Sequence, residues 1–527
     1  DLRLFWDADW GSYKRSMNLG ELRELYDSDP AVALPGMLVE IAYHDLASDT
    51  DALKEPNFER VAARAVVQGL VKYFEQRDGV DLTLFPEPPT QLAVQNRGDG
   101  QVRISWQAPA ADSSGLAGES ATGYRVYTSP NGVGWADAVT ATGATEYTLS
   151  GLDDGELVFV RVTSINAGGE SFPTETLAAR AGEYTGVLIV NGFDQISRYY
   201  LVPDVYERLG EVNMRMLLDQ MNSYDYIVQH GTAIALPFDS ASNEAVTNGP
   251  ISLSDYDVTD WILGEEWESY QTLSLAERSA LRSYLEGGGA LFISGAELGW
   301  TLVQKNIDPT FYTDYIRASY VADDAETYQA SPTAGGIFDG LPAFRFDAPG
   351  EYDVDYPDVM TGINGSDVSL VYQGGTGGAA GIQYANGCER VVHLGFPFET
   401  IHPDSQAGVM GRVMAFLGEC LDVPPSTTIV SPIDSMGYLE TPPFQGIASA
   451  INGVNRVEVA VIRDSDGACW DGVSWGVTEW HVASGTTAWS FAMPAELGLG
   501  VYTTRARAVD SGGVADPVPA EARFARV

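Results

Sequence analysis

The sequence predicts a multidomain chain that combines α/β and all-β folds. A chain of 527 residues is too long for one core, so three or four domains are expected. Proline-rich stretches at 85–90 and 424–425 are typical of linkers. The pattern also changes between them, from short alternating strands to apolar runs that alternate with helices. The predicted pieces are an incomplete α/β segment at 1–82, a β-sandwich at 86–182, a parallel-sheet α/β domain at 184–422 and a second β-sandwich at 424–527.

The charge of the chain restricts its partners. Asp and Glu number 73 against 30 Lys and Arg, which gives a net charge of −43. Such a field repels nucleic acid and anionic membrane surfaces, so neither is expected as a partner. It favours calcium, neutral or cationic polysaccharide, or simply a well-solvated surface. The sequence has no apolar run of about 18 residues, so we expect no membrane span.

The first segment places one carboxylate in an apolar stretch. Residues 37–41 are predicted to form a strand after the turn Pro35-Gly36, with Glu40 in its middle. A helix is predicted from Asn57 to about Glu75, because its apolar residues follow helical spacing behind Pro56. A carboxylate inside an apolar strand is costly unless it is paired, metal-bound or used in chemistry.

This segment resembles the C-terminal part of zinc-dependent N-acetylmuramoyl-L-alanine amidases. The resemblance rests on Asn-Leu-Gly-Glu-Leu-Arg at 18–23, Leu-Val-Glu-Ile at 38–41 and Asp-Ala-Leu-Lys at 51–54. It implies that Glu40 is the general base that acts on a zinc-bound water. The family's zinc ligands, two histidines and a glutamate, lie upstream of the matched part, and residues 1–32 contain no histidine. We therefore expect zinc and activity in a longer protein and neither in this chain; the alternative is a buried Glu40 paired with an arginine.

The second piece has the pattern of a β-sandwich. Strands are predicted at 101–106, 123–127, 147–149 and 158–163. The stretch resembles a fibronectin type III module in Trp106, in Tyr-Arg-Val-Tyr at 124–127, in Leu-Ser-Gly-Leu at 149–152 and in residues 160–171. The resemblance implies a spacer or binding module without chemistry, with Trp106 in the core.

The third piece reads as an open parallel sheet. Strands are predicted at 186–193, 226–229, 261–264, 290–294 and 391–395, and helices at 275–285 and 407–417. The run Gly-Gly-Gly-Ala-Leu-Phe-Ile-Ser-Gly at 287–295 resembles the flavodoxin-like fold of class I glutamine amidotransferases. The polar loop 238–244 is predicted to cap a helix through Ser240 or Ser242.

Ligands of such sheets bind at the carboxyl ends of the strands. The polar residues expected there are Asn191, Asp194, Glu265, Glu266, Ser294, Glu297, His393 and Glu399. The amidotransferase resemblance implies a nucleophilic cysteine in a strand-to-helix turn, but the turn here reads Ser294-Gly-Ala-Glu297 and glutamine hydrolysis is expected to be lost. A hydrolase that uses Ser294 with His393, or the carboxylates near Glu265 and Glu297, and a non-catalytic binding domain remain as alternatives.

Two further features concern metal and redox chemistry. The acidic stretch 351–358 makes Asp353, Asp355 and Asp358 candidate calcium ligands or part of a sugar-binding edge, and an exposed acidic loop is the alternative. Cys388 and Cys420 lie in the same predicted domain and could form a disulfide, which leaves Cys469 over.

The last piece predicts a second sandwich, with strands at 457–462, 488–492 and 502–508. It resembles bacterial immunoglobulin-like modules. Together the modules indicate a protein that is secreted or sits on the bacterial cell surface, with peptidoglycan or surface polysaccharide as partner. Three functions remain: a piece of a secreted cell-wall amidase, a structural or adhesive surface protein, and a hydrolase or carbohydrate-binding protein that uses its α/β domain.

Overall fold

The computed structural model describes most of the chain. The described residues are 39–111, 118–183, 185–196, 198, 202–206, 208, 210–215, 224–266, 271–349, 351–420, 425–450, 453–476, 480–493, 496–511 and 513–527. The motif at 18–23 and the start of the predicted strand 37–41 lie outside them. None of the helices in these ranges is long and apolar enough to cross a membrane.

From residue 39 to the first sandwich, the described residues form two helices, α2 (Ala47–Leu53) and α3 (Pro56–Asp78). Pro56 occupies the first turn of α3, and Gly79 ends the helix with a left-handed φ of 65°, so the predicted helix is confirmed. The strand expectation for Glu40 is wrong where it can be checked. Residues 39–43 are irregular and Glu40 is exposed, because no neighbouring strand in the described residues pairs with them. Its carboxylate therefore carries no cost of burial.

The first β-sandwich has two facing sheets. One contains β1 (Thr90–Gly98), β2 (Gln101–Gln107) and β5 (Glu146–Ser150). The other contains β3 (Gly123–Ser129), β4 (Val139–Thr142), β6 (Leu157–Asn166), β7 (Gly169–Glu170) and β8 (Leu177–Arg180). Trp106 is buried and meets the ring of Tyr124 edge-on at 5.1 Å, so its core position is confirmed.

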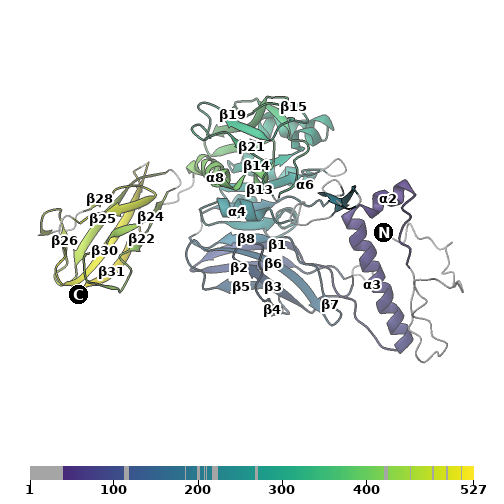
Figure 1. The fold of residues 1–527 in the computed structure, drawn as a ribbon, viewed down its shortest axis with the longest axis horizontal. Coiled ribbons are helices and arrows are strands. Elements are labelled where there is room, and N and C mark those ends of the chain that lie inside the picture. The colour runs from purple at the N-terminus through teal and green to yellow at the C-terminus, as the bar shows by residue number, and fades with distance from the viewer. Residues whose placement is uncertain are drawn as a thin grey trace.

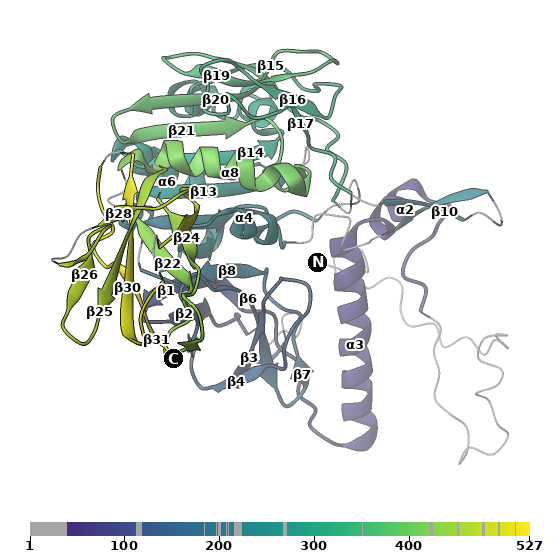
Figure 2. The same cartoon turned by 60° about the vertical axis from the view of Figure 1, so that its left-hand side comes forward.

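The α/β domain is built on five parallel strands. They are β9 (Val187–Asn191), β12 (Asp239–Ser242), β13 (Val258–Glu265), β14 (Ala290–Ala296) and β21 (Glu389–Leu394), and they lie in the order β12-β9-β13-β14-β21. The chain order 2-1-3-4-5 is one of the orders of doubly wound sheets, with its switch point between β9 and β13. Figures 1 and 2 show this sheet between the sandwich and the antiparallel strands.

Helices cover both faces of the parallel sheet. α4 (Ile227–Ala233) packs against α8 (Pro403–Leu417), and α5 (Asn243–Thr247) packs against α6 (Leu275–Glu286). Separate apolar cores fill the two layers. Ser242 caps α5 by accepting the backbone N–H of Ala245, as predicted. The strand predicted at 226–229 is wrong, since these residues enter α4; a short buried apolar run does not distinguish a strand from a helix.

An antiparallel extension continues the sheet beyond β21. It comprises β15 (Ala318–Ala322), β16 (Gln329–Pro332), β17 (Phe344–Arg345), β18 (Val359–Gly362), β19 (Asp367–Tyr372) and β20 (Ala379–Asn386). A separate hairpin pairs β10 (Val202–Tyr206) with β11 (Glu211–Arg215). In the chain, the strands of this extension come between β14 and β21. The segment 318–372 lies next to the ends of the parallel strands.

The sandwich and the α/β domain share one sheet. β1 pairs with β12 in antiparallel fashion, with Ala93 opposite Ala241 and Val94 opposite Ser240. Hydrogen bonding is therefore continuous across the boundary that the sequence predicts between 182 and 184. This junction was not anticipated from the sequence.

The C-terminal piece is a second sandwich, as predicted. One sheet contains β22 (Ser426–Ser431), β24 (Phe444–Ser449) and β29 (Ala488–Phe491). The other contains β23 (Gly437–Tyr438), β25 (Val454–Arg463), β26 (Ala468–Trp470), β27 (Trp475–Gly476), β28 (His481–Val482), β30 (Gly500–Asp510) and β31 (Ala520–Arg526). Cys469 in this sandwich is buried, whereas Cys388 in the α/β domain is disulfide-bonded. The pairing of Cys388 with Cys420 stays a prediction, because the side chain of Cys420 lies outside what is described.

Candidate functional site

Polar side chains, three of them carboxyl groups, gather at the carboxyl ends of three adjacent parallel strands. Asn191 ends β9, Glu265 ends β13 with Glu266 next to it, and Glu297 follows the last residue of β14. All four side chains are buried. The switch point of the sheet lies between the first two of these strands, which is where ligands of such sheets bind. The structure thus places this part of the predicted site together.

Glu297 occupies a sharp strand-to-helix turn. Its φ is 70°, a left-handed conformation that is uncommon for a residue with a side chain. Glycines flank it two residues away on each side. A Cβ at Gly295 would lie 2.5 Å from the Cβ of Leu263, and a Cβ at Gly299 would lie 2.8 Å from Cδ2 of Tyr320. The sequence Gly-Ala-Glu-Leu-Gly therefore has the spacing and the close packing of a nucleophile elbow, with glutamate at the reactive position.

The surroundings of Glu297 keep its carboxyl group protonated. Burial, followed by repulsion from Asp358, Asp323 and Glu265, raises its pKa from 4.5 to about 10. At neutral pH the ionised fraction is then on the order of one in a thousand. In this state the carboxyl group of Glu297 can donate a hydrogen bond.

After burial, Asp358 contributes most to the raised pKa of Glu297. Its fully buried carboxylate accepts the backbone N–H groups of Gly299 at 2.6 Å and Trp300 at 3.3 Å. Burial raises its pKa from 3.8 to about 8, although these two hydrogen bonds favour the ionised form. Asp358 therefore fixes the turn that presents Glu297.

Glu265 anchors the acidic stretch at 351–358. Its carboxylate accepts the backbone N–H of Asp355 at 3.1 Å and of Tyr356 at 3.2 Å, and burial raises its pKa well above the usual range. Asp353 and Asp355 are exposed while Asp358 is buried. The described residues contain no group of three or more His, Cys, Asp or Glu side chains that could hold a metal ion, so the calcium expectation gains no support.

A second group of polar side chains lies around β9. Glu266 accepts the backbone N–H of Asp194 at 3.2 Å, and Asn243 donates to Asp194 at 3.4 Å. Asn191 donates to Glu175 at 2.8 Å, while its own side-chain oxygen is buried and unpaired. Burial raises the pKa of Glu175 to about 8. Glu175 was not anticipated, because it belongs to the fibronectin-like part of the sequence.

Glu399 lies in a different, internal network. His230 contacts Asp260 through Nδ1 at 2.7 Å and Glu399 through Nε2 at 3.4 Å, and Tyr352 donates to Glu399 at 2.8 Å. Burial lowers the pKa of His230, but Asp260 and Glu399 outweigh it and raise the pKa to about 9. The imidazolium between two carboxylates is fully buried, and its role is to join β13, α4 and the segment around 399.

The geometry contradicts a Ser294–His393 pair. In the β14–β21 register His393 lies opposite Ile293, and Ser294 lies opposite Leu394, so their side chains point to opposite faces of the sheet. His393 contacts the carbonyl oxygen of Ile293 at 3.1 Å, and burial lowers its pKa to about 4. Ser294 accepts the backbone N–H of Phe398 instead. The strand-to-helix turn therefore centres on Glu297, three residues after the serine, and the Gly-x-Glu-x-Gly spacing is the sequence signal for it.

Residues 87–180 match the family model of the fibronectin type III domain. Similar solved structures include the FN5 domain of Drosophila Lar, at 14% identity over 19% of this chain and 99% of that chain with a TM-score of 0.15. Another contains titin kinase and its flanking domains, at 26% identity over 18% of this chain and 16% of that chain with a TM-score of 0.16. A β-1,2-glucanase from Parabacteroides distasonis matches at 19% identity over 20% of this chain and 14% of that chain, also with a TM-score of 0.16. The chain thus contains a fibronectin type III domain, a module typical of extracellular modular and adhesive proteins.

Proposed function

We propose that this chain is part of an extracellular modular protein of the bacterial surface whose α/β domain hydrolyses a neutral polysaccharide. The supporting observation is the protonated carboxyl group of Glu297 at the reactive position of a strand-to-helix turn. A carboxyl group kept neutral at pH 7 by its surroundings serves as a general acid. The charge of −43 favours a polymer that carries no negative charge.

In this proposal Glu297 donates its proton to the oxygen of the leaving sugar as the bond between that oxygen and the anomeric carbon breaks. A water molecule forms the new bond to the anomeric carbon, and its proton passes to a second carboxylate. Asp323 fits that role because it is half-buried, accepts from the hydroxyl of Tyr320 at 3.3 Å and is among the charged neighbours of Glu297. Asp358 is a positioning residue, since its carboxylate is committed to the turn.

The test is release of reducing ends from neutral polysaccharides by the purified chain. Glu297→Gln keeps the shape of the protonated side chain but removes the proton source, so activity should fall at least about a hundredfold. Asp367→Asn changes an exposed carboxylate elsewhere in the domain and should leave the rate unchanged. Absence of release from every neutral polymer, or equal rates for Glu297→Gln and the unaltered chain, would exclude the proposal.

A second candidate function is cell-wall amide hydrolysis by a longer protein that includes this chain. Helix α3 supports it, because Val67 and Leu70 lie three residues apart on one face of the helix and are 41% and 40% exposed, which is typical of a helix face that a larger core covers. The described residues do not provide a zinc site, so we derive no catalytic step for Glu40. The candidate predicts that an extended protein with upstream histidines binds zinc and cleaves peptidoglycan, and that Glu40→Gln abolishes the cleavage while zinc remains bound.

A further inference from the structure

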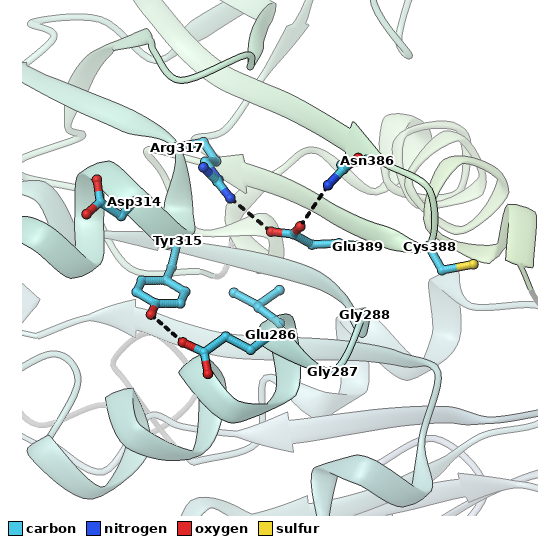
Figure 3. A pocket seen from close by; sticks show the side chains of 10 residues that line it. Glu286, Gly287, Gly288, Asp314, Tyr315, Arg317, Asn386, Cys388 and Glu389 are labelled. Atoms are coloured by element: carbon cyan, nitrogen blue, oxygen red, sulfur yellow. Dashed lines mark hydrogen bonds and ion pairs between the residues drawn. The ribbon is translucent and has the colours of Figure 1, made fainter.

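A cavity of about 530 Å³ opens at the opposite edge of the parallel sheet (Figure 3). Gly287 and Gly288 precede β14, and Asn386 and Cys388 precede β21, so the cavity lies at the amino ends of these two parallel strands. The strand β14 has seven residues, which separates the cavity from Glu297 by about 20 Å. The cavity is therefore distinct from the group of carboxyl side chains at Glu265, Glu266 and Glu297, called the carboxylate site below.

The cavity walls carry both donors and acceptors whose positions are fixed by mutual contacts. The hydroxyl of Tyr315 donates to Glu286 at 2.6 Å, and Arg317 donates to Glu389 at 3.1 Å. Asn386 contacts the other oxygen of Glu389 at 3.5 Å. Figure 3 shows Tyr315 directed at Glu286, and Arg317 and Asn386 both directed at Glu389. The recognition groups are thus arranged before any ligand arrives.

Arg317 is the most constrained of these residues. Its φ is 66°, in the left-handed region, and its guanidinium lies 4.5 Å from the ring centre of Tyr384. The Nε atom of Arg317 is buried and has no hydrogen-bond partner. Strained backbone and an unsatisfied buried donor are both features that recur at ligand sites.

The size and charge of the cavity define its ligand. Its volume lies within the range of roughly 300–1,000 Å³ that is usual for small-molecule sites. Three carboxylates, on Glu286, Asp314 and Glu389, line the cavity together with the guanidinium of Arg317, which pairs with Glu389, and the C-terminal end of α6 adds partial negative charge. Phosphates and uronic acids are repelled, whereas a ligand with a positive charge and several hydroxyl groups is complementary.

We propose that this cavity binds an amino-sugar unit of a polysaccharide. The ammonium group pairs with the wall carboxylates, and the ring hydroxyls bond with Arg317 and Asn386. This binding does not depend on hydrolysis at Glu297, since the two sites occupy opposite edges of the sheet. It would hold the chain on a partly deacetylated polymer while the other edge remains accessible.

The proposal is tested by titrating the full chain with the glucosamine disaccharide, with its N-acetylated form and with glucuronic acid. Binding is measured by nuclear magnetic resonance or calorimetry. The glucosamine disaccharide should bind at least tenfold more tightly than its N-acetylated form, and glucuronic acid should not bind. Equal affinity for the two disaccharides, tighter binding of glucuronic acid, or no binding of the glucosamine disaccharide would overturn the proposal.

Variants locate the binding and separate it from catalysis. Glu286→Gln retains an acceptor for Tyr315 but removes one charge, and Asn386→Ala removes a polar side chain; each should weaken binding at least fivefold. Asp367→Asn serves as the matched control and Glu297→Gln as the catalytic control, and both should bind like the unaltered chain. Unchanged affinity in Glu286→Gln and Asn386→Ala, with their folds verified by circular dichroism, would place the ligand elsewhere and refute the assignment.

Discussion

Replacing Glu297 by glutamine should make the α/β domain less sensitive to alkaline pH. The pKa of Glu297 is raised from 4.5 to about 10, so between pH 6 and 8 the folded chain holds a proton that the unfolded chain has lost. Stability then falls as pH rises, by about 1.4 kcal/mol per pH unit for this one group. The glutamine side chain carries no such proton, and its contribution is independent of pH.

Between pH 6 and pH 8 the free energy of unfolding of the unaltered chain should therefore fall by about 2.7 kcal/mol more than that of Glu297→Gln. For a domain of this size it corresponds to a relative gain of about 5–11 °C in melting temperature. Calorimetry of both proteins at the two pH values measures it. Other buried carboxylates, including Glu265 and Asp358, affect both proteins alike, so only the change in the difference between them reports on Glu297.

Asp367→Asn provides the control, because it makes the same kind of acid-to-amide change at an exposed position on β19 instead of at the turn. If Glu297→Gln and the unaltered chain lost stability in parallel between pH 6 and 8, Glu297 would be ionised in the folded state. The reasoning that assigns it as a proton donor would then fail.

Two further predictions concern the turn and the shared sheet. Gly295→Ala should destabilise the chain by about 1–3 kcal/mol, because the new Cβ would lie 2.5 Å from the Cβ of Leu263. The control is Gly411→Ala in α8, where a new Cβ would meet no atom within 4 Å; it should be neutral or stabilise the chain by up to about 1 kcal/mol. Denaturant titration of both variants measures this, and equal effects would contradict the close packing at the turn. Calorimetry should also show the fibronectin type III domain melting together with the α/β domain, since β1 and β12 are hydrogen-bonded neighbours. If the fibronectin type III domain instead melts in a separate transition, and Asn96→Ala leaves that transition unchanged, the two domains do not unfold cooperatively through this junction.

The sequence predicts correctly those strands and helices whose apolar residues repeat with a clear period or whose ends are marked by capping residues. Helix α6 begins with a reciprocal capping box between Ser274 and Glu277 and ends at Gly287, so its limits follow from local chemistry. The segment 226–229 offers neither signal, and its apolar residues suit a buried helix as well as a strand. The second parallel strand of the structure is β12 instead, whose sequence Asp-Ser-Ala-Ser is polar. A polar strand in the middle of a sheet is visible only when its neighbours are known.

The candidate site was predictable in location but not in chemistry. The rule that ligands bind at the carboxyl ends of parallel strands selects Asn191, Glu265 and Glu297 from the sequence alone. Whether Glu297 holds a proton depends on its burial and on Asp358, which comes from a segment distant in the chain and accepts backbone N–H groups of the turn itself. The expected pairing of Ser294 with His393 failed because strand register decides which face of the sheet a side chain occupies, and register depends on segments distant in the chain.

The shared sheet changes the role of the fibronectin type III domain. At the junction, Asp239 accepts the backbone N–H of Asn96 at 2.7 Å and the hydroxyl of Tyr256 at 2.8 Å, and burial raises its pKa to about 6. This buried network fixes β1 against β12, so the domain cannot rotate as a flexible spacer would. Its residue Glu175 in turn accepts a hydrogen bond from Asn191 at the end of β9. The domain therefore supplies one wall of the carboxylate site, and a chain lacking residues 87–180 should lose the geometry of that site together with the sheet edge that supports it.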